Sequence, residues 1–216
     1  MGRGCAKRER GLSFLRTGGF VLFVKKIKCD GDDDEPNDGD PFFLCVLAVL
    51  HLNGCGVAMD QNKAIELWQR ASDNGFGPAS FTLGKIYMSF SQGNNTNDPN
   101  MRKVAEYYKK AGEWGVAGAW YNLGCMYDAG QLGKRQLAVA MGYWEKAAAM
   151  GYAPAQYNLG ITYTKGGPGV PINRKLGEKW YREAARQGEK RAIFNISRDY
   201  KTGILYGAYD VDIFPN

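Results

Sequence analysis

The sequence has a single histidine, no paired cysteines and no long apolar run, and each of these shortages excludes a class of protein. His51 has no Cys, Asp or Glu on its own helix face, so we interpret it as structural and not as a metal ligand or general base. Five cysteines form no CxxC pair and no regular spacing, which indicates neither a zinc site nor a disulfide framework: Cys5, Cys29, Cys45, Cys55 and Cys125. No Ser/His/Asp or Cys/His combination is legible, so the sequence predicts no enzyme and no cofactor.

The apolar segments are too short for a membrane span or a secretion signal. The run FFLCVLAVLHL at residues 42–52 has eleven residues, well below the roughly 20 that cross a bilayer. The segment FVLFV at residues 20–24 is shorter than the apolar core of a signal peptide and lies too far into the chain. Together with the unpaired cysteines, these features predict a cytoplasmic protein without a transmembrane segment.

Charge is distributed along the chain in blocks. Residues 1–28 carry eight Lys/Arg and one acid, whereas residues 29–40 carry seven acids and no base. Residues 165–201 carry ten Lys/Arg and four acids, so most of the net charge of +6 belongs to this stretch. A charged, apolar-poor segment gains more from solvation than from burial, and we therefore predict a flexible N-terminal tail over residues 1–41, basic and then acidic.

A repeat of 36 to 40 residues organises the rest of the chain. A glycine recurs at these separations, with an alanine four residues before it and another four residues after it. Eight residues after each glycine comes a leucine or isoleucine, then a small residue, and three positions later a tyrosine. The glycines are Gly75, Gly115, Gly151 and Gly188, the small residues are Gly84, Gly124, Gly160 and Ser197, and the tyrosines are Tyr87, Tyr127, Tyr163 and Tyr200. Self-similarity at this period is typical of helical repeat arrays.

Each repeat is expected to contain two helices. In the second helix the apolar residues fall at i, i+3, i+4 and i+7, which gathers them into one stripe. The recurring glycine then stands where a helix end needs a left-handed residue, as Gly75 does. Asp60, Asn173 and the pair Asp98-Pro99 are placed as N-terminal caps.

The small residue of the first helix predicts close packing. A glycine inside a helix costs about 1 kcal/mol relative to alanine. The return of glycine at Gly124 and Gly160 therefore indicates positions where a second helix approaches too closely for a side chain. The tyrosine three residues later is expected to fill the gap between neighbouring repeats.

The repeat resembles a known family. The stretch NGCGVAMDQNKAIELWQRASDNG at residues 53–75 and the unit APAQYNLGITYTKG at residues 153–166 resemble the Sel-one-like repeat (SLR), a relative of the tetratricopeptide repeat. The resemblance implies an all-α fold, a right-handed α-solenoid of about 4.5 helix-turn-helix repeats. We place the solenoid at residues 42–203, with repeats at about 43–75, 76–115, 116–151 and 152–188, a terminal helix at 189–203 and a C-terminal tail at 204–216.

The resemblance also implies a function and a surface. SLR proteins serve as adaptors, so we expect a protein or peptide partner on a concave face lined by the first helices. Positions three before and one after the recurring small residue should face it, with further basic residues at its C-terminal end that favour an acidic partner. The candidate partner-binding residues are Phe81, Lys85, Tyr121, Tyr157, Phe194, Arg191, Arg198 and Lys201. The structural alternative is that the aromatic rings only pack within the repeat itself and bind no partner.

Three further hypotheses remain open at this point. One branch of the family is associated with β-lactam binding or hydrolysis and is held by paired cysteines within each repeat, which this chain lacks. Nucleic-acid binding by the basic fourth repeat would use four cations on one helix side, but acids interrupt them and no nucleic-acid motif is present: Lys175, Lys179, Arg182 and Arg186. The first helix is apolar on all sides, so we expect its outer face to be covered by the preceding GFVLFV segment, by upstream repeats, or by a partner or second copy of the chain.

Overall fold

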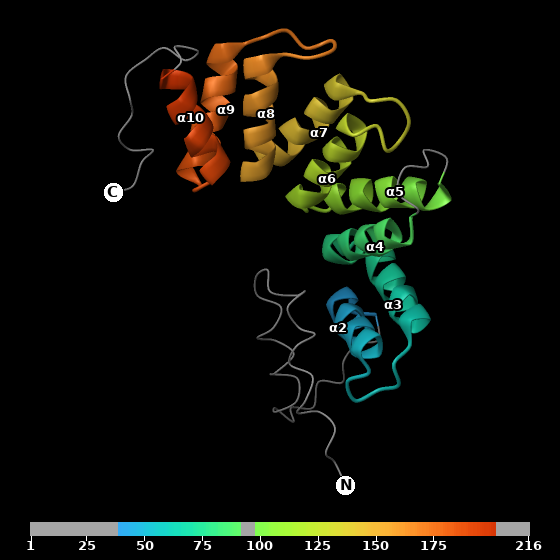
Figure 1. The fold of residues 1–216 in the computed structure, drawn as a ribbon. Helices are drawn as coiled ribbons and strands as arrows, with labels where there is room; N and C mark the ends of the chain where they lie inside the picture. The colour runs from blue at the N-terminus through green and yellow to red at the C-terminus, as the bar shows by residue number, and fades with distance from the viewer. Residues whose placement is uncertain (1–38, 92–97, 202–216) are drawn as a thin grey trace. The chain divides into compact units, whose positions relative to one another are not determined.

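The computed structural model describes residues 39–91 and 98–201, and within these ranges the chain forms helices and no named strand (Figure 1). The helices are α2 (Pro41–Asn53), α3 (Gln61–Asp73), α4 (Gly77–Phe90), α5 (Pro99–Glu113), α6 (Ala117–Asp128), α7 (Leu137–Ala149), α8 (Ala153–Lys165), α9 (Arg174–Arg186) and α10 (Lys190–Lys201). They divide into two compact units, with α2 and α3 before the boundary at Phe76 and α4 to α10 after it. The all-α helical-repeat fold predicted from the sequence is confirmed: four helix pairs and one further helix are present in the described ranges.

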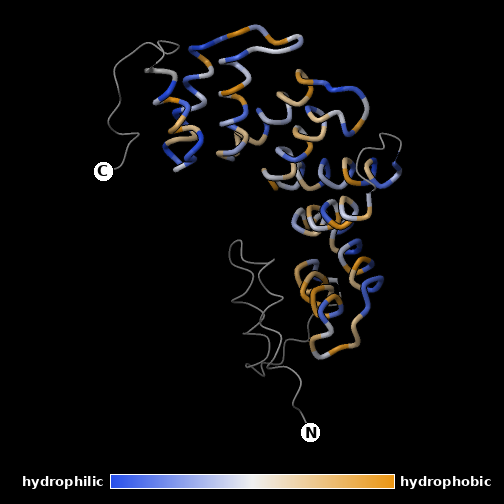
Figure 2. Tube along the Cα trace, in the orientation of Figure 1, coloured by the Kyte–Doolittle hydropathy of each residue, from blue (hydrophilic) through white to orange (hydrophobic). Residues whose placement is uncertain are grey.

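The first unit is a helix pair whose ends are fixed by acidic caps. The Asp40 carboxylate accepts a hydrogen bond of 2.8 Å from Phe42 N, and Pro41 occupies the first turn of α2. The Asp60 carboxylate accepts a bond of 3.0 Å from Lys63 N and begins α3 as predicted. Helix α2 is mostly apolar, and orange predominates over it in Figure 2, whereas α3 has one buried stripe.

The second unit stacks three helix pairs and α10. The members of each pair pack most closely, as α4 with α5, α6 with α7, and α8 with α9. Successive pairs meet through α5–α6 and α7–α8, and α10 packs on α9 and α8. The array thus places the first helices α4, α6, α8 and α10 in regular succession (Figure 1).

The recurring glycines terminate the second helices as the sequence predicts. Gly115, Gly151 and Gly188 have φ of 85°, 80° and 80°, the left-handed region that an L side chain rarely adopts. The next residue bonds back into the helix, as Tyr152 N does to Ala147 O at 3.1 Å. These glycines reverse the chain after every second helix and keep the repeats in register.

The glycines of the first helices lie against aromatic rings of the second helices, which confirms the prediction of close packing. A Cβ on Gly84 would meet Tyr108 at 2.6 Å, and a Cβ on Gly124 would meet Trp144 at 2.6 Å. Gly160 likewise lies against Tyr181, whose side chain is fully buried. Each ring takes the space that a side chain on the glycine would need.

The tyrosines three residues after these glycines lie elsewhere than expected. Tyr87 stacks on Tyr107 at 5.5 Å between ring centroids, and Tyr127 stacks on Tyr143 at 5.4 Å. Both contacts join the two helices of one pair, so the expectation that these rings fill the gap between neighbouring repeats was wrong for Tyr87 and Tyr127. Tyr163 does reach the preceding repeat, because its hydroxyl donates a hydrogen bond of 2.9 Å to Glu145 on α7. The reason is geometric: the tyrosine faces the second helix of its own pair, as the glycine one turn earlier does. The side chains of residues 199–201, including Tyr200, lie outside the described structure.

Candidate functional site

The first helices of the second unit carry a row of aromatic side chains. Phe81, Tyr121 and Tyr157, on α4, α6 and α8, are half-buried, and Phe194 on α10 is 66% exposed. None of the four rings is fully buried, so each presents part of its surface to solvent. We call the surface made by this row and its neighbours on α4, α6, α8 and α10 the first-helix face.

Three of the rings are covered by a group from the following repeat. Phe81 Cζ lies 3.8 Å from the position of a Cβ on Gly118, and Tyr121 packs on Tyr152 with 5.3 Å between ring centroids. The guanidinium of Arg191 lies over Tyr157, 4.5 Å from the ring centroid. No helix follows α10 within the described residues, and Phe194 is correspondingly the most exposed ring of the row.

Arg191 is held in place from two sides. Its Nε and Nη2 donate to the two carboxylate oxygens of Glu189 at 2.8 and 3.0 Å, and its guanidinium rests on the Tyr157 ring. The hydrogen bond with Arg191 lowers the pKa of Glu189, and the same bond raises the pKa of Arg191. Both groups are therefore charged at neutral pH, and a bidentate pair stacked on a ring has little freedom to move.

The neighbours of Arg191 on this face are neutral hydroxyl and thiol groups. Burial raises the pKa of Tyr121 to about 12, with the Cys125 thiol acting in the same direction and Arg191 against it. Burial likewise raises the pKa of Tyr152 and of Cys125. These groups stay protonated at neutral pH and can donate hydrogen bonds. We call Tyr121, Cys125, Tyr152, Tyr157 and Arg191 the central cluster.

The first-helix face also carries cations outside this cluster. Three equivalent positions of each first helix were compared: the residue before the buried alanine, the second residue after it and the sixth residue after it. In the four first helices these positions include Lys85, Arg191 and Arg198 and no Asp or Glu. Lys85 Nζ lies 5.9 Å from the Phe81 ring centroid, and Lys85 and Arg198 are both exposed. Lys201, the remaining sequence candidate, ends α10, and its side chain lies outside the described structure.

Sequence reasoning placed Tyr121, Tyr157 and Arg191 among the candidates and missed Tyr152. The structure brings the first three together, and Tyr152 joins them from the turn between α7 and α8. At its position, the residue after the recurring glycine, the repeats carry Phe76, Val116, Tyr152 and Glu189. Because the residue type changes from repeat to repeat, periodicity alone gave no signal for Tyr152. The role of all these residues in binding stays a prediction.

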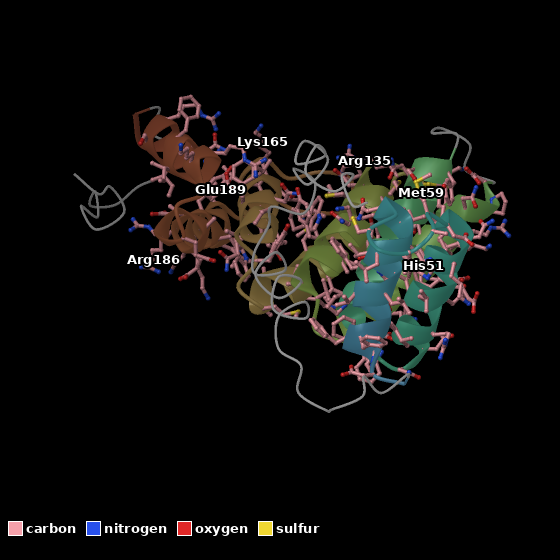
Figure 3. All side chains as sticks on the ribbon, turned by 90° about the horizontal axis from the view of Figure 1, so that it is seen from below. His51, Met59, Arg135, Lys165, Arg186 and Glu189 are labelled. Carbon is pink, nitrogen blue, oxygen red and sulfur yellow. The ribbon has the colours of Figure 1, made fainter. Side chains whose placement is uncertain are left out.

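The basic stripe of α9 is partly neutralised by its own helix. Arg182 Nη2 lies 2.8 Å from Glu178 Oε1, and both side chains are less than one-fifth exposed. Arg186, labelled in Figure 3, pairs with Glu183 at 2.8 Å. The hollow along this stripe is lined by the same acids as well as the bases, and within the described ranges its cations without an ion pair are Lys175 and Lys179.

His51 stabilises the turn between α2 and α3. Its Nδ1 lies 3.2 Å from Ala58 O and donates a hydrogen bond that ties α2 to the loop before α3 (Figure 3). Within residues 39–91 and 98–201 no group of three or more His, Cys, Asp or Glu is placed to hold a metal ion. In the same ranges no helix is both long and apolar enough to cross a membrane.

Comparison with known proteins identifies the repeat. The sequence model of the Sel1 repeat matches residues 42–76, 118–152 and 153–189. Among solved structures, the chain is similar to a protective antigen of uropathogenic Escherichia coli strains that displays an SLR fold, with 25% identity, a TM-score of 0.67, and coverage of 86% of this chain and 37% of that protein. It is also similar to a Sel1 repeat protein from Oxalobacter formigenes, with 24% identity, a TM-score of 0.65, and coverage of 81% and 67%.

The chain thus spans little more than a third of the length of the E. coli protein and about two thirds of the Oxalobacter protein. The likeness in fold extends over both described units. Three matched repeats, together with the glycine and alanine pattern of a fourth, show that the chain belongs to the Sel1 repeat family.

Proposed function

We propose that the chain is a protein-interaction module that binds a segment of a partner protein on the first-helix face. Sel1 repeat proteins generally mediate protein–protein interaction. The observation that carries the proposal is a row of partly exposed aromatic rings, accompanied by Lys85, Arg191 and Arg198 and by no acid at the equivalent positions. Aromatic and arginine side chains contribute most to affinity in protein interfaces, and the cations favour an acidic partner.

A hydrolase-like function receives less support. Such an enzyme needs a nucleophile with an adjacent base, and the β-lactam-associated branch of the family relies on cysteine pairs. Cys45, Cys55 and Cys125 are free thiols in the described structure, and burial raises the pKa of Cys45 to about 12, which makes it a poor nucleophile at neutral pH. We therefore propose a binding role for the chain without catalysis.

Nucleic-acid binding is also the weaker alternative. Phosphate neutralisation requires several unpaired cations along one face. On α9, the pairs Arg182–Glu178 and Arg186–Glu183 occupy two of the four bases in the stripe. Binding that survives high salt would further favour apolar protein contacts, since phosphate contacts weaken steeply as salt rises.

The test is an affinity capture with the full chain, read by mass spectrometry. Phe194→Ala is the first variant, because a ring that is 66% exposed can be truncated with little effect on folding. The double variant Tyr121→Ala, Tyr157→Ala is the second, after its helicity has been checked by circular dichroism. The matched control is Trp114→Ala, which removes an aromatic ring that is 58% exposed in the turn after α5.

We expect a stoichiometric partner of the wild type to be lost from the Phe194 and tyrosine variants and kept by the Trp114 variant. If all variants retain the same partners, the rings are scaffold and the proposed face is wrong. Loss with the Trp114 variant alone would move the binding surface to the turns that join the repeats.

A further inference from the structure

The first and last described helices, α2 and α10, are covered to different extents. On α10 the residues of the first-helix face are exposed, and Phe194 is 66% exposed. The equivalent residues of α2 are Phe42, Cys45 and Val49, which we call the Cys45 side; Cys45 is 3% exposed, and the other two are half-buried. Helix α10 packs on both α9 and α8, whereas α3 is the described helix that packs closely on α2. Helical packing alone predicts the opposite order of burial.

The burial around α2 extends in directions that a single neighbouring helix does not reach. Leu44, Cys45 and Val46 follow one another in the sequence and are 1%, 3% and 3% exposed. Because successive residues of an α-helix point about 100° apart, these three side chains span about 200° of the circumference. The stripe that a helix buries against a neighbour is typically little more than about 100° wide. A second segment must therefore cover α2 in addition to α3.

Repeat packing does not account for the burial of the Cys45 side. On α6 the equivalent positions carry Tyr121 and Cys125, and both side chains are half-buried. Helix α6 nevertheless packs on α5 of the preceding repeat and on α7 of its own repeat. A helix from an upstream repeat would thus leave the Cys45 side of α2 partly open, as α5 does for α6. The cover of Cys45 is of another kind.

The segment before α2 that has the composition of such a cover is FVLFV, at residues 20–24. It is the only run of five consecutive apolar residues before Pro41. Residues 28–40 contain seven Asp or Glu and offer little apolar surface. Large apolar side chains are what an apolar helix surface requires, because each buries area that would otherwise face water. Residues 20–24 lie outside the described structure.

The length of the connection favours this segment over a second molecule. Sixteen residues separate Val24 from Pro41, and a flexible chain of that length spans roughly 20–24 Å on average. Helix α2 has 13 residues and is about 20 Å long. A tether whose average span matches the distance to the site gives an effective concentration in the millimolar range. A separate protein or second copy at micromolar concentration competes poorly with it.

We infer that residues 20–24 of the same chain cover the Cys45 side of α2. The contact closes the first end of the repeat array, a role that terminal elements fulfil in repeat proteins, where an uncovered apolar helix would lead to association. It concerns the first unit alone and is independent of partner binding by the first-helix face of the second unit.

Cys45 itself reports whether the cover is present. Its alkylation rate in the folded full chain is measured by mass spectrometry, with exposed Cys55 as the reference thiol in the same molecule. The variant is Leu22→Asp with Phe23→Asp, which places two charges in the apolar run. No residue of a described helix is changed, and circular dichroism compares the helicity of variant and wild type. Phe23→Ala is measured beside it as a milder change that introduces no charge.

The matched control is Phe14→Asp with Leu15→Asp. It makes the same two substitutions at adjacent positions of the same tail, outside residues 20–24. A general effect of added acidic charge on the tail or on the thiol would appear equally in both double variants. Loss of the cover would appear only when residues 22 and 23 are changed.

We expect the Leu22 and Phe23 double variant to raise the alkylation rate of Cys45 relative to Cys55 at least tenfold, because an uncovered thiol becomes accessible and ionises more readily. Phe23→Ala should give a smaller increase in the same direction, and the control should change the ratio less than twofold. A synthetic peptide of residues 17–28, TGGFVLFVKKIK, should slow Cys45 again in the double variant when added at about 1 mM, the effective concentration of the tethered segment.

Three results would overturn the inference. An unchanged Cys45 rate in the Leu22 and Phe23 double variant means that another segment covers the helix. An equal increase in the control means that the apolar run has no specific role. A wild-type rate that rises on roughly hundredfold dilution shows that a second copy supplies the cover, because only association between molecules depends on protein concentration.

Discussion

Replacement of Gly124 by alanine tests whether the glycines of the first helices exist for packing. The added Cβ would lie 2.6 Å from Cδ1 and Nε1 of Trp144 and 2.9 Å from the backbone oxygen of Ala140. Real Cβ atoms essentially never approach other atoms so closely, and the Trp144 ring that would have to shift is 97% buried. The carbonyl is part of α7, so α6 and α7 must separate if the methyl group is to fit.

The expected magnitude follows from two opposing terms. Overpacking of a well-filled core costs typically about 1–3 kcal/mol, whereas alanine gains about 1 kcal/mol over glycine inside a helix. The packing term is larger because the Trp144 ring and a backbone atom are blocked together. We therefore expect Gly124→Ala to lower the free energy of unfolding by about 1–2 kcal/mol.

Gly142→Ala is the matched control on the facing helix. Gly142 lies in α7, is exposed, and has no atom within 4 Å of the position of its Cβ. The helix-propensity and unfolded-chain terms are the same as for Gly124, but the packing term is absent. This variant should be more stable than the wild type by roughly 0.5–1 kcal/mol.

Urea unfolding followed by far-ultraviolet circular dichroism measures both variants. The two substitutions lie in one helix pair, so both report on the unfolding of the same part of the array. Opposite signs are the expected outcome, with urea midpoints that differ from the wild type by roughly 0.3–1 M for each kcal/mol. If Gly124→Ala is as stable as Gly142→Ala, the helices adapt without cost and the close-packing argument is refuted.

Further predictions concern a cap, two thiols and a hydroxyl. Asp98→Ala should destabilise α5 by about 1–2 kcal/mol, because the buried carboxylate accepts hydrogen bonds from Asn100 N at 2.8 Å and Ser91 Oγ at 2.6 Å. Urea unfolding measures the loss, with Asp98→Asn, which keeps a capping oxygen, as the control. An unchanged urea midpoint for Asp98→Ala would contradict the prediction. Alkylation at pH 8, mapped by mass spectrometry, should modify exposed Cys55 quickly and buried Cys45 about a thousandfold more slowly. Burial raises the pKa of Cys45 to about 12, and each pKa unit lowers the thiolate fraction tenfold. Equal alkylation rates of the two thiols in the folded protein would contradict the burial of Cys45. The pKa of Tyr121 is raised to about 12, so the folded state favours the neutral hydroxyl. The contribution of this hydroxyl to stability is complete below about pH 10 and is lost as the pH rises through 12. Tyr121→Phe should therefore flatten the alkaline decline of the urea midpoint, and identical declines in variant and wild type would reject that role.

Much of the fold could be predicted from the sequence because the repeat restates the same local signals. Asp60, Asp98 and Asn173 cap α3, α5 and α9 as expected, and each carries a side-chain oxygen that accepts a backbone N–H at the first turn. The glycine after each second helix has a positive φ as expected. Caps and left-handed glycines depend only on residues a few positions apart, so helix ends of this kind can be predicted from a single sequence.

The candidate site could be predicted only in part, because its contacts depend on the rotamers of side chains from different repeats. Spacing placed Tyr157 and Arg191 on the same general face, but nothing in the sequence indicates that the guanidinium lies on the ring. That arrangement is imposed by Glu189, two residues before Arg191 and outside the helix, which takes two of the guanidinium nitrogens. A long flexible side chain adopts one position only when a second partner fixes it.

The number of basic residues in a helix overstates the positive charge that the helix presents. Helix α9 has five bases and looks the more cationic of the last two helices, yet Glu178 and Glu183 stand three or four residues before Arg182 and Arg186, the spacing at which helical side chains meet. On α10, Arg191, Phe194 and Arg198 follow at steps of three and four residues on one side, and no acid lies between them at those steps. Arg191 is nevertheless paired as well, with Glu189 in the turn before α10. The charge that a partner meets on a helix therefore depends on the spacing of acids relative to bases and not on the number of bases alone.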